Sequence, residues 1–118
     1  MTSEKPVFVQ IIEMIEDDIL SGVYGADDLI ISTPHISKLL SVNPATAQRA
    51  ITVLTDRGVL YKKRGVGMAV TRDAKELLLR ERKAAFYGRV VPDFVRGAKK
   101  IGIADDELLK LVKENLHD

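Results

Sequence analysis

The sequence contains no cysteine and only two histidines, His35 and His117, among its 118 residues. Without cysteine the chain forms neither disulfides nor thiolate metal sites, which fits a reducing compartment. Neither histidine has a carboxylate or serine at the spacing of a catalytic pair, and no glycine loop lies between a strand and a helix, where it would cradle a phosphate. We therefore expect no enzymatic activity, no metal and no cofactor.

Long apolar stretches are also missing. The longest run without Asp, Glu, Lys or Arg is the ten residues from Leu39 to Gln48, whereas a membrane-spanning helix needs about 20. Residues 1–5 lack the apolar core of a signal peptide. The sequence thus predicts a cytoplasmic protein with no membrane partner.

Charge of either sign is nearly balanced, with a net charge of +1, but it is unevenly distributed. Between residues 43 and 64 only one carboxylate, Asp56, opposes five cations, so this stretch carries +4. The cations are Arg49, Arg57, Lys62, Lys63 and Arg64. A local basic patch of this kind binds polyanions without requiring a basic chain.

Residues 43–57 are predicted to form a short helix that lies on another molecule. Asn43 is a preferred N-cap, and Gly58 supplies the left-handed residue that commonly follows a last turn. On the outward face, Gln48 can donate and accept at an adenine edge, while Arg49 can fork onto guanine or a phosphate. The alternative is an ordinary amphipathic helix whose solvent face happens to be polar.

A basic hairpin, or wing, is predicted to follow over residues 60–71. Two short runs of strand-compatible residues flank Gly65 and Gly67, which permit positive φ in a tight turn. Three cations, Lys62, Lys63 and Arg64, stand at its tip. The alternative is a solubilising edge whose lysines oppose aggregation.

Two earlier helices complete the pattern. Residues 6–20 have isoleucines at helical spacing and an acidic remainder that includes Glu16, which we interpret as a solvated face rather than a pair for acid/base catalysis. Ser32 is expected to cap a second helix that buries Ile36, Leu39 and Leu40. Residues 29–31 could add a short strand to the hairpin.

Only residues 41 and 42 separate the second helix from the third, so these two helices must cross steeply as a helix-turn-helix. Residues 5–72 are therefore predicted to form a winged helix-turn-helix domain, mainly α with a small antiparallel β wing. In this arrangement the later helix, over residues 43–57, enters the major groove of DNA. The amides near residues 32–34 and 43–45 are candidates for phosphates.

Residues 73–118 are predicted to form a helical dimerisation region, with a bend at Pro92. Two helices cannot bury their apolar stripes against each other alone, and the winged domain is too small to cover both. A second copy of the chain would cover them and would supply two reading heads for a palindromic site. The alternative is a monomer whose tail folds back. The predicted dimerisation residues are Leu79, Phe86, Val90, Phe94, Ile101, Leu108, Leu111 and Val112.

From about Lys5 to Thr71 the sequence resembles the GntR-type bacterial transcription regulators, through residues 6–11, 19–22, 40–46, 50–51, 58–60 and 64–67. The Asn43-Pro44-x-Thr46 start of the third helix and the short tail are most similar to the YtrA-type subfamily. The resemblance implies a dimeric repressor with a short helical C-terminal region. It also implies that Thr46 contacts a phosphate or base and that Arg64 and Gly65 enter the minor groove.

Three departures from the family concern arginine. Pro34 stands where the family usually has an Arg that contacts DNA, so position 34 lacks that contact. Pro44 and Gln48 also replace arginines of the larger family, but both are usual in the subfamily and imply a different operator. Pro34 leaves open an alternative in which the winged helix is a protein-interaction module with little or no DNA binding.

The predicted function is sequence-specific DNA binding by a homodimeric repressor, with an operator duplex and a second copy as partners. A small-molecule effector could bind between the tail helices and wings of the dimer, but no residue cluster identifies it. The candidate DNA-binding residues are Ser32, Thr33, Asn43, Ala45, Thr46, Gln48, Arg49, Lys62, Lys63, Arg64, Gly65 and Gly67.

Overall fold

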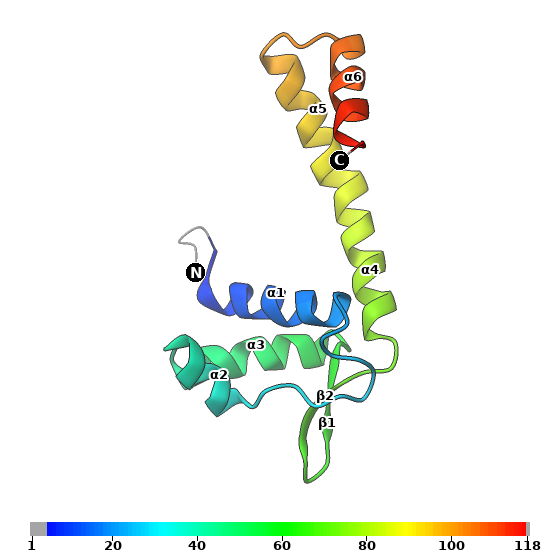
Figure 1. Ribbon diagram of the computed structural model, residues 1–118. Helices are drawn as coiled ribbons and strands as arrows, with labels where there is room; N and C mark the ends of the chain where they lie inside the picture. Colours follow the sequence, from blue (N-terminus) through cyan, green and yellow to red (C-terminus); the bar gives the residue numbers. More distant parts are fainter. Residues whose placement is uncertain (1–4, 118) are drawn as a thin grey trace. The chain divides into compact units, whose positions relative to one another are not determined.

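The computed structural model describes residues 5–117, which fall into two compact units divided between Arg80 and Glu81. The first unit contains α1 (Val7–Leu20), α2 (Thr33–Leu40), α3 (Pro44–Asp56), β1 (Leu60–Lys63), β2 (Gly67–Val70) and the first turns of α4 (Ala74–Ala85) (Figure 1). The second contains the end of α4, the π-helical segment η1 (Phe86–Val90), α5 (Val91–Lys100) and α6 (Asp105–Asn115). The predicted fold class is confirmed: a mainly helical winged helix-turn-helix followed by a helical C-terminal region.

The core of the first unit lies between α1 and α3, which run side by side in Figure 1. Isoleucines at helical spacing on α1 meet an apolar face on α3 that includes two alanines, which let the helices approach closely. Burying each large aliphatic side chain contributes roughly 1.5–3 kcal/mol, so this packing determines which face of α3 points outward. The buried residues are Ile11, Ile12, Ile15, Ile19, Ala47, Ala50, Ile51 and Leu54.

One predicted surface residue of α1 is instead buried. Glu16 was expected on a solvated acidic face, but it is only 7% exposed. Its Oε2 lies 2.8 Å from Nη2 of Arg57, at the C-terminal end of α3. A buried carboxylate requires a close cationic or hydrogen-bonding partner. The pair therefore ties α1 to the end of α3.

The turn between α2 and α3 is closed by hydrogen bonds that local sequence supplies. Ser41 adopts a left-handed conformation with φ of 53°. The Val42 N–H donates to the Ser37 carbonyl at 3.0 Å, and the Ser37 hydroxyl donates to the Val42 carbonyl at 2.6 Å. These reciprocal bonds fix the two-residue connection between α2 and α3.

The apolar face of α2 is narrower than predicted. Ile36 is fully buried and Leu40 is half-buried, but Leu39 is 63% exposed. Because α2 has only eight residues and packs chiefly on α3, only the stripe formed by positions four apart is covered. The prediction that Leu39 is buried was wrong.

The wing is the two-stranded antiparallel hairpin β1–β2, in which Leu60 pairs with Val70 and Lys63 pairs with Gly67. Gly65 has φ of +74°, and the Val66 N–H donates to the Lys63 carbonyl at 2.9 Å to close the turn. The short strand expected near residues 29–31 is present as a single antiparallel bridge between Leu29 and Ala69. It ties the loop before α2 to β2.

The start of α4 belongs to the core of the first unit, because Ala74 and Leu78 are buried in the same cluster as α1 and α3. The two compact units therefore meet within α4, between Arg80 and Glu81. The predicted boundary between the DNA-binding domain and the dimerisation region lies earlier, between residues 72 and 73. That boundary stays a prediction. Within residues 5–117, no helix combines the length and apolar character needed to cross a membrane.

In the second unit, the bend predicted at Pro92 takes the form of a π-helical turn. The Val91 N–H donates to the Phe86 carbonyl, five residues back. Proline has no N–H and its ring would clash with the carbonyl four residues earlier, and a widened turn ahead of it relieves both problems. Gly102, with φ of +76°, then reverses the chain between α5 and α6.

Candidate DNA-binding site

The N-terminus of α3 forms as its sequence predicts. The Asn43 side chain accepts the Ala45 N–H at 2.8 Å, and the Asn43 carbonyl accepts the Thr46 N–H at 2.9 Å. The Ala45 amide, predicted as a phosphate donor, thus already has a partner within the helix. The contribution left to Ala45 is its small exposed methyl group, which permits close approach.

The outward face of α3 carries a hydrogen-bonded side-chain network. The Thr33 hydroxyl, at the start of α2, donates to Oε1 of Gln48 at 3.2 Å. Nε2 of Gln48 donates to the Thr52 hydroxyl at 3.3 Å, one turn further along α3. Gln48 and Thr52 are exposed and Thr33 is half-buried. The network links the two helices of the helix-turn-helix on the surface that was predicted to read bases.

Arg49 is held by a residue that sequence reasoning did not connect with the site. Its guanidinium carbon lies 3.8 Å from the centre of the Phe8 ring, at the start of α1. An arginine stacked on an aromatic face gains about 0.5–1 kcal/mol at an exposed site. The stacking limits the rotamers of Arg49 while its side chain stays exposed.

The remaining predicted contacts on the helices differ in exposure. Ser32 is exposed, and its hydroxyl accepts the His35 N–H at 3.2 Å, which confirms the predicted cap of α2. Thr46 is half-buried. The roles assigned to these residues toward DNA stay predictions.

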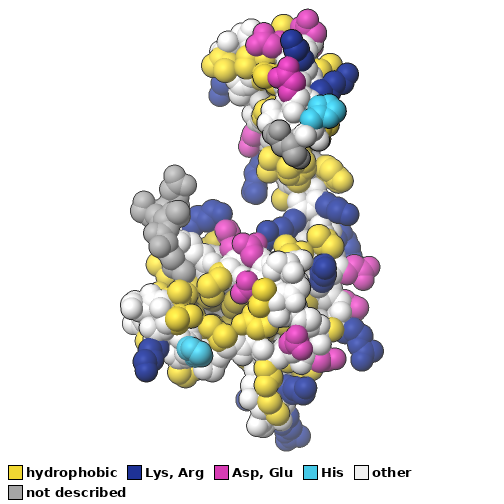
Figure 2. Space-filling model, viewed as in Figure 1, with side chains coloured by type: hydrophobic (Ala, Val, Ile, Leu, Met, Phe, Trp, Pro, Cys, Tyr) yellow, Lys and Arg dark blue, Asp and Glu magenta, His cyan; other side chains and the backbone are white. Residues whose placement is uncertain are grey.

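The tip of the wing is exposed and cationic. Figure 2 shows dark-blue side chains at the far end of the β1–β2 hairpin, beyond a column of hydrophobic side chains. Val66, which the sequence analysis did not single out, stands among the cations and is 60% exposed. The predicted wing residues Lys62, Lys63, Arg64, Gly65 and Gly67 are all exposed.

A hydrogen bond anchors the base of the wing. The Tyr61 hydroxyl on β1 donates to Oδ1 of Asp27 at 2.8 Å. Because this bond requires the phenol proton, it raises the pKa of Tyr61 above its ordinary value, with desolvation and the Asp27 charge acting in the same direction. With the bridge from Leu29 to β2, it connects both strands to the loop before α2.

The predicted dimerisation residues are mostly exposed, and all of them except Leu79, which lies at the end of the first unit, belong to the second unit. All except the half-buried Leu108 present at least a third of their surface to solvent. Four more large apolar residues share this exposure: Tyr87, Val91, Leu109 and Leu116. A π turn adds one residue to a helical turn, which rotates the rest of the helix by about 100°. The apolar stripe predicted from a regular helical period therefore did not include Tyr87 and Val91.

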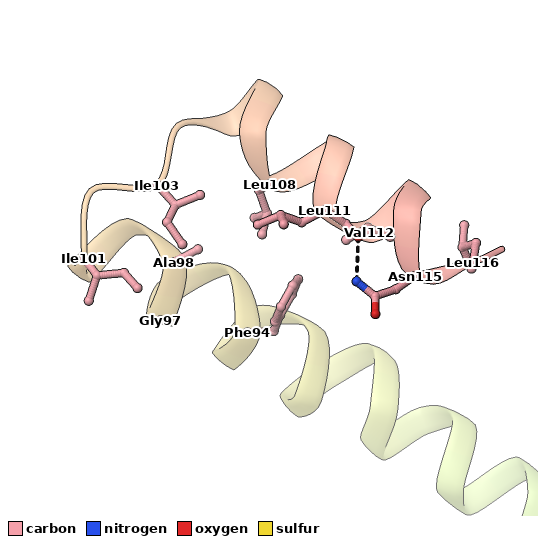
Figure 3. A pocket seen from close by; sticks show the side chains of 10 residues that line it. All are labelled: Phe94, Gly97, Ala98, Ile101, Ile103, Leu108, Leu111, Val112, Asn115 and Leu116. Carbon is pink, nitrogen blue, oxygen red and sulfur yellow. Dashed lines mark hydrogen bonds between the residues drawn. The ribbon is translucent and has the colours of Figure 1, made fainter. Parts of the chain in front are cut away.

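Between α5 and α6 lies an open apolar groove of about 770 Å³ (Figure 3). Phe94 from α5 faces Leu108 and Leu111 from α6. The polar side chain of the lining, Asn115, donates from its amide to the Leu111 carbonyl at 2.8 Å. Its lining residues are Phe94, Gly97, Ala98, Ile101, Ile103, Leu108, Leu111, Val112, Asn115 and Leu116.

A short helix pair with a polar outward face, followed directly by a cationic hairpin, defines a winged helix-turn-helix. Comparison with known proteins identifies its family. The HTH-type transcriptional repressor YtrA of Bacillus subtilis is 25% identical over 112 residues, which cover 95% of this chain and 85% of that protein. The solved structure of a GntR-family transcriptional regulator from Bacteroides thetaiotaomicron is 34% identical, with a TM-score of 0.78 over 93% of this chain and 96% of that one.

The DNA-binding domain of AraR, solved in complex with the operator ORE1, is 29% identical and has a TM-score of 0.55. The matched region covers 60% of this chain and 89% of the AraR chain. No protein-family model matches the chain.

The chain belongs to the GntR family of helix-turn-helix transcriptional regulators and is YtrA-like. It is a regulator with a DNA-binding winged helix-turn-helix, and not an enzyme. Membership of this family supports the DNA-binding interpretation over the alternative of a protein-interaction module with little or no DNA binding.

Proposed function

We propose that this protein is a homodimeric repressor that binds a palindromic operator. In each half-site α3 lies in the major groove and the wing lies on the adjacent backbone or minor groove. One observation carries the proposal: Gln48 and Arg49 are both exposed on α3 and both held by neighbouring side chains. Side chains ordered before binding lose less conformational freedom when they meet a base.

The wing supplies the contacts that do not depend on sequence. Its three terminal cations neutralise phosphates and release counterions, and its two glycines allow the backbone to approach. The operator complex of the AraR domain supports this use of the fold, because that protein shares the winged unit at 29% identity. The proposed contacts are those of Ser32, Thr33, Asn43, Ala45, Thr46, Gln48, Arg49, Lys62, Lys63, Arg64, Gly65 and Gly67.

The second unit supplies all of the proposed dimer contact except Leu79, which lies at the end of the first unit. The exposed apolar side chains of the second unit are not isolated on the surface, because several of them line the apolar groove between α5 and α6. A second copy of the chain that formed an interface of standard size, about 1,600 Å² in total, would remove these apolar side chains from water. The proposed residues are Leu79, Phe86, Val90, Phe94, Ile101, Leu108, Leu111 and Val112. The dimer places two α3 helices about 34 Å, or a multiple of this, apart on DNA. We propose the bacterial cytoplasm, where chromosomal DNA lies, as its location.

Two measurements test the proposal. Sequences selected from random duplexes by the full-length chain should contain two inverted half-sites, and sedimentation should give a dimer that Leu111→Glu dissociates. With 6–10 phosphate contacts, affinity for the selected duplex should fall by roughly 10³–10⁵ between about 50 and 200 mM salt. Single, unpaired half-sites and a monomer at all concentrations would exclude the homodimer. Reporter transcription from the selected operator, with and without the protein, tests repression.

A further inference from the structure

The Gln48 network leaves the side chain of Gln48 with a defined set of free hydrogen-bonding groups. A carboxamide has two N–H donors and two acceptor lone pairs. The bond from Thr33 uses one lone pair, and the bond to Thr52 uses one N–H. One donor and one acceptor remain.

This result does not depend on which way round the amide lies. Both partners are hydroxyls, and each can donate or accept. If the amide were rotated by 180°, Nε2 would donate to Thr33 and Oε1 would accept from Thr52, and the remaining pair would be unchanged. The two threonines therefore determine the number of free groups as well as the orientation of the amide plane.

One free donor beside one free acceptor matches one purine edge and not the other. In the major groove adenine presents the N7 acceptor and the N6 amino donor, whereas guanine presents two acceptors, N7 and O6. A guanine edge needs two donors, and Gln48 could supply the second only by breaking its bond to Thr52. We propose that Thr33 and Thr52 are specificity-determining positioning residues, which hold Gln48 so that it binds an adenine edge in preference to a guanine edge. The inference rests on the proposed placement of α3 in the major groove.

Selection from random duplexes with the full-length chain tests this proposal. The position read by Gln48 is the one whose base preference Gln48→Ala removes. There, wild type should select adenine, and Thr33→Val or Thr52→Val should lower the ratio of affinities for adenine and guanine duplexes about three- to tenfold. Thr33→Ser restores the hydroxyl and should preserve the ratio.

Thr55→Val is the matched control, because it removes a hydroxyl from the same helix that donates to the Ile51 carbonyl and not to Gln48. It should leave the ratio unchanged. Thermal unfolding and affinity for non-specific duplex are measured for every variant. Thr52→Val should alter neither, because Thr52 is exposed on α3 and belongs to no proposed DNA contact, and this separates positioning from a structural role.

The two proposals fail in different ways. If Gln48→Ala flattens one position but Thr33→Val and Thr52→Val keep its preference, or if that position selects a base other than adenine, only the positioning role is refuted. If Gln48→Ala alters no position, or the wild type selects no sequence, the placement of α3 is refuted and this inference falls with it.

Discussion

Replacing the three wing-tip residues Lys62, Lys63 and Arg64 with alanine should weaken binding to all DNA sequences alike. Each phosphate contact contributes about 0.9 to the slope of log affinity against log salt concentration. Since all three side chains are exposed at the tip, the triple variant should lose about 2.7 of the wild-type slope. At 0.1 M salt this corresponds to roughly 500-fold weaker binding, and the difference should vanish near 1 M.

Fluorescence anisotropy with a labelled duplex, over about 50–200 mM salt, measures both slope and affinity. The control variant removes the same charge from the second unit by replacing Lys99, Lys100 and Lys110 with alanine. These lysines are exposed on α5 and α6. The control should keep the wild-type slope, because these lysines belong to no proposed DNA contact.

An equal slope in the wing variant and the wild type would refute the placement of the wing on the phosphate backbone. An equal loss of slope in both triple variants would show that net charge, and not the wing, sets the salt dependence. Gln48→Ala provides the opposite comparison. This variant should alter base preference and leave the salt slope of affinity unchanged, because Gln48 is proposed to contact a base and not a phosphate.

Three further variants test how α3 is held. Arg57→Met should lower the free energy of unfolding by about 2 kcal/mol. This loss is smaller than for a fully buried ion pair, because the Arg57 side chain is 32% exposed. Urea unfolding measures the loss, and adding Glu16→Leu should recover part of it. Phe8→Leu keeps an apolar side chain but removes the ring below Arg49, so operator affinity should fall about two- to fivefold while non-specific binding persists. Equal operator affinity would show that the stacking has no role. Gly58→Ala should cost about 1–2 kcal/mol in thermal unfolding, because φ there is +82°, and an unchanged midpoint would contradict this backbone strain.

Local sequence was sufficient to predict the elements of the first unit. Asn43 and Ser32 cap helices through bonds to amides two or three residues away. Gly58 and Gly65 end a helix and close a turn because their own φ angles are positive. Such signals act within a few residues, so they are readable before any tertiary structure is known. The order of the elements then indicated a winged helix-turn-helix.

The partners of individual side chains were not readable in this way. Nothing near Glu16 in the sequence indicates that Arg57 will bury it, and nothing near Gln48 indicates Thr33. These contacts arise only when α1, α2 and α3 pack together, because the crossing of helices brings distant positions within a few ångströms. The sequence by itself determined where the helices α1, α2 and α3 begin and which face of α3 is polar. Tertiary packing decided which of those polar groups are already occupied, because hydrogen bonds and ion pairs depend on separation in space rather than along the chain.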